Sequence, residues 1–185
     1  MLKKYSKLFK EDKSGRSRSF YFKKNSEIYE VSEKLIKTFL LHYSKKYNED
    51  ARVCLHANYK DPLQDMVLIQ HSKNFYPPHK HANRYDTYHV LEGCLGVVIF
   101  NNNGKVTKIY KLKKNFFYKT PKNKYHLTLP LTTRVIYHEY RSGTFDRKTN
   151  CIFPNWTPQN NDSKFKFKKK ILNKLNNKKN LINLF

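Results

Sequence analysis

Cysteine and long apolar runs are both scarce in this sequence of 185 residues. The three cysteines, Cys54, Cys94 and Cys151, are odd in number and have no CxxC spacing, so they predict neither a disulfide framework nor a zinc knot. No stretch approaches the ~20 apolar residues that span a membrane, and the N-terminal segment lacks the apolar core of a signal peptide. These absences predict a soluble protein of the reducing cytoplasm.

Acidic residues are also few, since 14 Asp and Glu stand against 38 Lys and Arg and give a formal net charge of +24. Such an excess normally indicates a nucleic-acid or anionic-membrane partner. It is concentrated at the ends, however: residues 1–24 carry nine basic and two acidic groups, and residues 164–185 carry eight basic and no acidic groups. The middle has no nucleic-acid-binding motif. We therefore expect no specific nucleic acid as partner and only weak membrane-surface contact by the basic tail.

The length suits one domain with flanking sequence. Residues 1–24 are basic, Ser-rich and aperiodic, which indicates a flexible arm. In residues 25–158, the expected domain, apolar residues between positions 26 and 47 recur every three or four positions and predict an amphipathic helix. Residues 159–185 are rich in Lys and Asn and predict a solvated tail. The alternative is a basic amphipathic helix with an apolar face of Ile171, Leu172, Leu175 and Ile182.

From Arg52 to Tyr140, short runs of β-branched and aromatic residues are separated by Pro, Asn, Asp and Gly. The runs are residues 52–55, 66–75, 87–100, 105–112, 115–120, 125–131 and 133–140. Asn102, Asn103 and Gly104 favour a hairpin turn, since Asn and Gly accept a positive φ at little cost. Many short strands without intervening helices predict a mainly β fold, a sandwich or a barrel.

Histidine spacing indicates a metal site in this β region. His79 and His81 lie two residues apart, which in a strand places both imidazoles on one face. A tight turn can return the carboxylate of Asp86 to the same centre, and His126 can reach it from a later strand. Imidazoles with one carboxylate suit one divalent transition metal ion, such as Fe, Mn, Ni, Co or Zn. The alternative is chance, because surface strands carry isolated HxH pairs.

The same residues carry a family resemblance. The segment HKHANRYDTYHVLEG is similar to the first cupin motif, whose positions are filled by His79, His81, Asp86 and Gly93. The segment PKNKYH resembles the second motif through Pro121 and His126. Asn115 and Asn123 replace the usual Gly of that motif, and Asn is the next-best residue for left-handed backbone. The resemblance implies a cupin double-stranded β-helix, a jelly-roll barrel, that binds one metal ion.

More narrowly, residues 52–158 resemble the WbuC family of cupin-fold metalloproteins, through stretches such as RVCLH, PPHKH, YHVLEG, YHEYRSGTFD and FPNWTP. Members of that family are associated with gene clusters for O-antigen and other surface polysaccharides. The resemblance therefore implies a role in lipopolysaccharide biosynthesis, near sugar-nucleotide metabolism, and a homodimer. Asp86 stands where the family usually has Glu, which leaves it as a direct ligand or as one that acts through water.

Six further side chains are candidates for catalysis or substrate binding. Tyr88 shares a strand face with the carboxylate ligand and is either a proton donor or a core tyrosine. His138 and Glu139 are candidates for a general acid or base, with a supporting or interface role as the alternative. Arg52, His56 and Arg84 are candidates for holding a phosphate or carboxylate of a substrate, with surface solvation as the alternative.

The sequence thus predicts a metal-binding cupin that acts on a small substrate, by the resemblance a sugar nucleotide or sugar acid. Metal-dependent isomerisation, epimerisation or lyase chemistry is expected ahead of an Fe-dependent oxygenase reaction. One alternative is a non-catalytic module that uses a metal to bind or sense a small ligand. Another is a nucleic-acid or membrane binder that acts through its basic tails.

Overall fold

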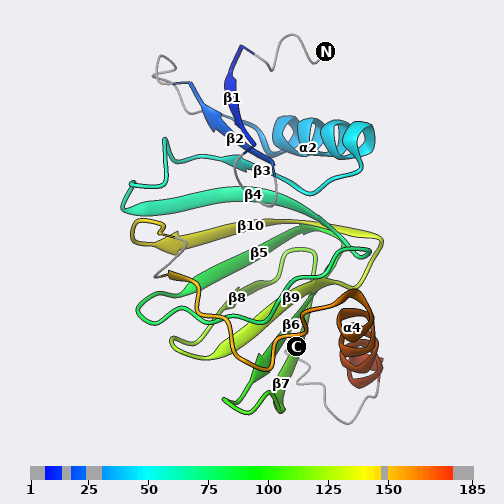
Figure 1. Ribbon diagram of the computed structural model, residues 1–185. Coiled ribbons are helices and arrows are strands. Elements are labelled where there is room, and N and C mark those ends of the chain that lie inside the picture. Colours follow the sequence, from blue (N-terminus) through cyan, green and yellow to red (C-terminus); the bar gives the residue numbers. More distant parts are fainter. Residues whose placement is uncertain (1–6, 14–17, 24–30, 147–149, 177–185) are drawn as a thin grey trace.

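The computed structural model describes residues 7–13, 18–23, 31–146 and 150–176 of the chain. Strands dominate them, in two sheets that face each other (Figure 1). The elements are β1 (Phe9–Asp12), β2 (Arg18–Phe22), α2 (Glu33–Tyr47), β3 (Ala51–Cys54), β4 (Leu63–His71), β5 (Asp86–Glu92), β6 (Cys94–Phe100), β7 (Val106–Lys113), β8 (Phe117–Lys119), β9 (Tyr125–Pro130), β10 (Arg134–Ser142) and α4 (Asn161–Asn176). The mainly β fold that the short runs predicted is confirmed.

The larger sheet has the strand order β1-β2-β3-β4-β10-β5-β8, and the smaller one has the order β7-β6-β9. The inner faces of both sheets share one apolar core, to which β10 contributes Val135 and Tyr137, β6 contributes Leu95 and Val97, and β5 contributes Val90. Alternate residues of a strand point to opposite faces, so the intervening residues of β10 lie on the outer surface of the larger sheet. This alternation decides which predicted site residues reach the interior.

The N-terminal residues form part of the larger sheet, which differs from the flexible arm expected for residues 1–24. β1 and β2 pair antiparallel, and β2 continues the sheet parallel to β3. Phe9, Phe20 and Phe22 are buried against α2 and the outer face of the sheet. Arg18 pairs with Glu49 at 2.9 Å. The arm is ordered over these strands because its three phenylalanines lose their contact with water.

The predicted amphipathic helix is α2, which begins at Glu33 rather than at position 26. The Ser32 hydroxyl accepts a hydrogen bond from the Leu35 amide at 3.2 Å and caps the helix. Asn48, with a φ of 55°, ends it in the left-handed conformation. The helix buries Phe39 and Leu40 against the outer face of the larger sheet, beside β3 and β4.

The C-terminal segment is a helix over residues 161–176, where a solvated tail was the first expectation. Ile171 and Leu175 of α4 are buried against Val98, Phe100 and Leu127 of the smaller sheet. The alternative, an amphipathic helix, is therefore what these residues form, although its apolar face packs on the barrel (Figure 1). Ile182, which was placed on the same face, lies outside the described residues. Among the described helices, none is both long and apolar enough to cross a bilayer.

The turns of the second cupin motif are preserved without glycine. Asn115 has a φ of 70° and Asn123 a φ of 54°, so both adopt the left-handed conformation that was expected of them. The Asn123 amide donates to the His81 carbonyl at 3.0 Å. The turn before β9 is thereby tied to the segment that carries His79 and His81.

Candidate metal centre

The four side chains predicted as ligands converge at one point inside the barrel. His79, His81, Asp86 and His126 each offer one ligand atom, and these atoms all lie within 4.8 Å of one another. Asp86 begins β5 of the larger sheet, and His126 lies in β9 of the smaller one. The backbones of His79 and His126 form an antiparallel bridge, with N···O distances of 2.9 and 2.8 Å. The centre therefore joins the two sheets.

Backbone carbonyls fix the tautomer of all three histidines. His79 Nδ1 lies 3.1 Å from the Pro77 carbonyl, His126 Nδ1 lies 3.0 Å from the Lys124 carbonyl, and His81 Nδ1 bonds to the Asn150 carbonyl. A carbonyl oxygen only accepts, so each Nδ1 must carry its proton. In the neutral imidazole this leaves the Nε2 lone pair free to bind a metal ion.

The Nε2 atoms of His81 and His126 meet the same carboxylate oxygen. They approach Asp86 Oδ2 to 3.0 and 3.4 Å respectively. Both Nε2 atoms are buried, and neither has a hydrogen-bond partner of good geometry in the described part of the chain. Buried polar atoms without such partners are rare in folded proteins. The cluster thus consists of three imidazoles and one carboxylate, and two of the imidazole Nε2 atoms lack a hydrogen-bond partner. This set of donor atoms fits a divalent transition metal ion.

Arg141 orients the carboxylate of Asp86. Its Nε forms an ion pair with Asp86 Oδ1 at 3.2 Å, without hydrogen-bond geometry, whereas the histidines approach Oδ2. Arg141 Nη2 also pairs with Glu139 Oε1 at 2.6 Å, and both side chains are almost fully buried. On the histidine side, the Tyr88 hydroxyl donates to Asp86 Oδ2 at 3.3 Å. The Asp86 carboxylate therefore presents one defined oxygen to the centre.

The charges of this cluster shift its pKa values strongly. Burial disfavours the carboxylate form of Asp86, but the charge of Arg141 and the two imidazoles outweigh it and hold the Asp86 pKa well below its usual value. Burial, together with His126 and His81, lowers the pKa of His79 to about 3. Burial also opposes protonation of His81, yet Asp86 raises the pKa of His81 to about 9. At neutral pH, His79 is therefore neutral and Asp86 is ionised.

Sequence reasoning assigned no role to Arg141. A signal existed, because Arg141 and the candidate Glu139 are separated by one position in a strand and so share its face. What connects Arg141 to the site is the register between strands, in which Arg141 of β10 stands opposite Asp86 of β5. That register is a long-range property of the fold.

Of the three predicted catalytic residues, Tyr88 contacts the Asp86 carboxylate, and Glu139 is linked to it only through Arg141. Tyr88 is buried in the inner core, and burial raises the pKa of its hydroxyl well above the usual value. His138 is on the opposite face of β10 from Glu139 and Arg141, because side chains alternate along the strand. There its Nε2 bonds to Asp65 of β4. The structure thus does not bring His138 to the cluster.

The three predicted substrate-binding residues are divided between two places. Arg52 and His56 line a cleft of about 370 Å³ on the inner side of the larger sheet, and Arg141 forms part of its wall. Arg84 is buried and donates through Nη2 to the Thr144 carbonyl at 2.7 Å. Burial and the neighbouring charge of Arg141 lower the pKa of Arg84. Arg141 therefore connects the Arg52 cleft to Asp86.

Comparisons with known proteins give a partial match. The model of a family described as a domain of unknown function, DUF6016, matches residues 32–112, a range that includes His79, His81 and Asp86 but ends before His126. No curated protein matches the chain.

Among solved structures, the capsular polysaccharide assembling protein CapF from Staphylococcus aureus is 16% identical, with a TM-score of 0.47 over 57% of this chain. The aligned part is 31% of the CapF chain, so this chain spans about a third of that relative. KdgF from a Halomonas species is 15% identical, with a TM-score of 0.42 over 54% of this chain and 83% of that chain. The two facing sheets and the ligand cluster between them give this chain a barrel of the cupin type.

Proposed function

We propose that this protein is a metal-dependent cupin that acts on a small anionic substrate. The observation that carries the proposal is the set of three Nδ1-to-carbonyl hydrogen bonds, which leaves the Nε2 atoms of His81 and His126 beside Asp86 Oδ2 and the His79 ring in the same cluster. Hydrogen bonds of this kind orient the histidine ligands of metal sites in general. A structural role for the cluster would leave buried nitrogen atoms without partners.

The donor set favours one divalent ion among Fe, Mn, Ni, Co and Zn, held by His79, His81, His126 and Asp86. Such an ion, when bound, would act as a Lewis acid that polarises substrate oxygens. Because Asp86 Oδ2 lies between two imidazoles, direct ligation is favoured over ligation through water. The side chain is shorter than Glu, but Arg141 holds it toward the centre.

The Arg52 cleft is the proposed entrance for the substrate. Arg52 and Arg141 line it with His56 and could hold a carboxylate or phosphate, while Asp12 and Asp146 also line the cleft and offset part of the positive charge. Arg84 would act as a buried charge behind Arg141 rather than as a direct contact. By the WbuC resemblance, we extend the proposal to a sugar nucleotide or sugar acid of surface-polysaccharide synthesis in the cytoplasm.

Tyr88 is the proposed hydrogen-bond donor to a substrate oxygen, because its hydroxyl lies 3.3 Å from Asp86 Oδ2 and its raised pKa keeps it protonated. It would hold a proton beside a substrate oxygen in an isomerase, epimerase or lyase reaction. A non-catalytic ligand-binding module is the second candidate. The outward position of His138 favours it, because the expected general acid or base is displaced from the centre.

Metal-loaded protein incubated with sugar nucleotides and sugar acids in deuterated water tests the proposal. We expect NMR to show exchange or conversion of at least one substrate, and no change with a His126→Ala variant. A Tyr88→Phe variant should bind the substrate but turn it over more slowly. Binding without exchange would contradict the enzyme and favour the binding module. Oxygen uptake with the Fe-loaded protein would instead indicate an oxygenase.

A further inference from the structure

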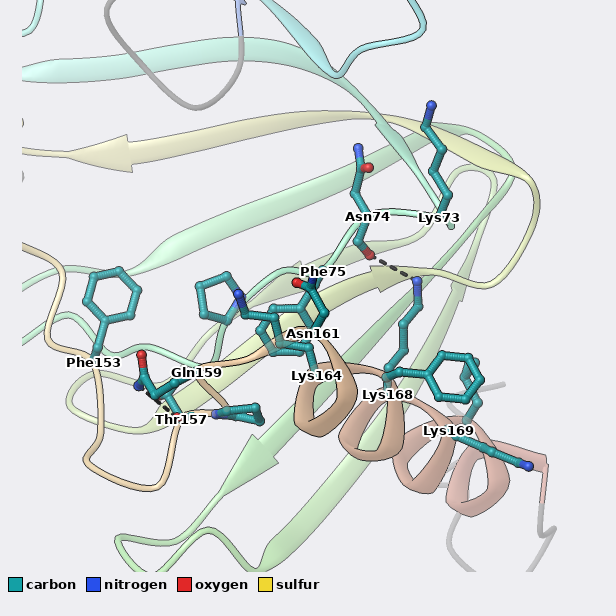
Figure 2. Close-up of a pocket in the computed structure, with 14 residues that line it drawn as sticks. Lys73, Asn74, Phe75, Phe153, Thr157, Gln159, Asn161, Lys164, Lys168 and Lys169 are labelled. Atoms are coloured by element: carbon teal, nitrogen blue, oxygen red, sulfur yellow. Dashed lines mark hydrogen bonds between the residues drawn. The ribbon is translucent and has the colours of Figure 1, made fainter.

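A second cleft lies beside the metal centre, outside the barrel. It has a volume of about 1110 Å³ and lies between residues 73–77, which follow β4, and the segment 153–172 with α4 (Figure 2). Pockets for small ligands have volumes of ~300–1,000 Å³. The space is therefore sufficient for a molecule of nucleotide size.

The lining of this cleft is strongly positive. Four lysines line it and no Asp or Glu does, and the lysines are Lys73, Lys164, Lys168 and Lys169. Lys168 reaches from α4 to the carbonyl of Asn74 at 2.9 Å, as Figure 2 shows, and so joins the two walls. Within the described residues, no carboxylate forms an ion pair with Lys164 or Lys169. The cleft thus holds cationic charge that an anionic ligand could neutralise.

The helix α4 presents this lining as a continuous stripe. Its cleft residues recur at intervals of three and four positions and include Asn161, Lys164, Phe165, Lys168 and Leu172. This spacing places them on one side of a helix. Ile171 and Leu175 follow Lys164 at seven and eleven positions, so they lie at one edge of the same side, and they pack on the barrel. The barrel therefore covers one edge of this side, and the residues that line the cleft stay open to a ligand.

Aromatic side chains accompany the lysines. Phe153 and Phe165 line the cleft with 46% and 67% of their surface exposed, which is unusual for phenylalanine. Phe75 lines the opposite wall. Exposed aromatic rings stack on planar bases, with a contribution of ~1–3 kcal/mol per base. The ligand that fits both features is an anion that carries a planar group.

The cleft and the metal centre share a wall. The Pro77 carbonyl, which accepts from His79 Nδ1, belongs to a residue that lines the cleft. The Phe153 ring lies 6.1 Å from the His79 ring. The backbones of Lys80 and Ile152 form two hydrogen bonds of 3.0 Å, which tie the segment before Phe153 to the ligand segment. A ligand in the cleft therefore lies on the His79 side of the centre.

From these observations we propose that the cleft binds a nucleoside diphosphate, with the phosphates among the cleft lysines of α4 and the base on Phe153. The inference rests on the proposed function, because the cleft would hold the nucleotide of a sugar-nucleotide substrate while the Arg52 cleft would hold a carboxylate of its sugar. A nucleoside diphosphate is favoured over an anionic membrane, because Ile171 and Leu175 of α4 are buried against the barrel and the lysines line a cleft rather than a flat surface.

Titration calorimetry with uridine 5′-diphosphate tests the cleft. The variant Lys164→Gln/Lys169→Gln should weaken binding about tenfold or more, because hydrogen bonds to charged groups are lost. The matched control Lys166→Gln/Lys170→Gln removes the same charge from residues of α4 that do not line the cleft, and should change the affinity less than about twofold. Phe153→Ala should weaken binding of the nucleotide but leave that of inorganic pyrophosphate unchanged.

A His126→Ala variant separates this inference from the proposed function. It should lose the metal and keep the nucleotide, with circular dichroism confirming the fold. Equal losses in the two lysine double variants, or no binding by the unaltered protein, would overturn the nucleotide site and leave the metal centre untouched. Binding to phosphatidylglycerol vesicles that depends on Lys164 and Lys169, without nucleotide binding, would also overturn it. If the unaltered protein binds the nucleotide but no metal ion, the proposed function is overturned and the nucleotide site is retained.

Discussion

At the scale of the residue, the metal centre is defined by the groups that contact the ligand side chains from outside the cluster. The spacing of His79 and His81 was readable from the sequence because it is local, although the structure places His79 in an isolated bridge and His81 outside the strands. The role of Arg141 was not readable, because it depends on pairing of β10 with β5. Sequence reasoning chose His138 and Glu139 from the same strand, but the alternation that puts Glu139 and Arg141 inside puts His138 outside. A shift of one position along β10 decides whether a side chain points into the barrel or away from it.

Replacing Arg141 should damage both the fold and the metal centre. Arg141→Met leaves the buried charge of Asp86 without its partner, which typically costs ~3–5 kcal/mol of unfolding free energy. The control is Arg134→Met on the same strand, whose ion pair with Glu92 is exposed and worth ~0–1 kcal/mol. Urea denaturation and metal titration measure the two effects. Equal destabilisation by both substitutions would refute the orienting role of Arg141.

Metal affinity should rise with pH between about 6 and 9. Without metal, the pKa of His81 is raised to about 9 by Asp86, so below that pH a proton occupies the position that the ion needs. His79, with a pKa of about 3, contributes no proton in this range. Release of one proton predicts a dissociation constant that weakens about tenfold for each pH unit below 9. Competition titrations at pH 6, 7 and 8 measure it, and a flat profile would contradict the His81–Asp86 contact.

At the scale of the element, the strands were easier to predict than the ends of the chain. The runs between residues 52 and 140 have the composition of strands, so composition sufficed. In the N-terminal arm, the lysines between Phe9, Phe20 and Phe22 hid the apolar pattern. In α4 the pattern was visible, but its partner was not, because the surface that receives it comes from β6 and β9. Elements that depend on distant partners escaped sequence reasoning.

Packing of α4 on the barrel predicts a large effect of one substitution. Ile171 is 3% exposed, and Ile171→Ala should lower the free energy of unfolding by ~2–5 kcal/mol. Phe165→Ala on the cleft side of the same helix should cost less than ~1 kcal/mol, because that ring is already largely in water. Denaturant titration compares the two variants. A solvated tail would instead make both substitutions neutral.

At the scale of the whole molecule, part of the excess positive charge has a place in the fold that does not require a nucleic-acid partner. Part of it lies in β2, where Arg18 pairs with Glu49 and Glu11. Another part lines the cleft beside α4, through Lys164 and its neighbours. The net charge therefore says little about the function of the chain ends, because it does not show which lysines lie on the same surface. The homodimer stays a prediction from the WbuC resemblance.

The measurement that tests the metal centre most directly is elemental analysis of protein purified without chelator. We expect about one ion per chain, lost in His79→Ala and His126→Ala and retained in His89→Ala, which removes a histidine that stacks on Phe117 away from the ligand cluster. Absence of a stoichiometric ion, even after reloading with Fe, Mn, Ni, Co and Zn, would contradict the metal-dependent function.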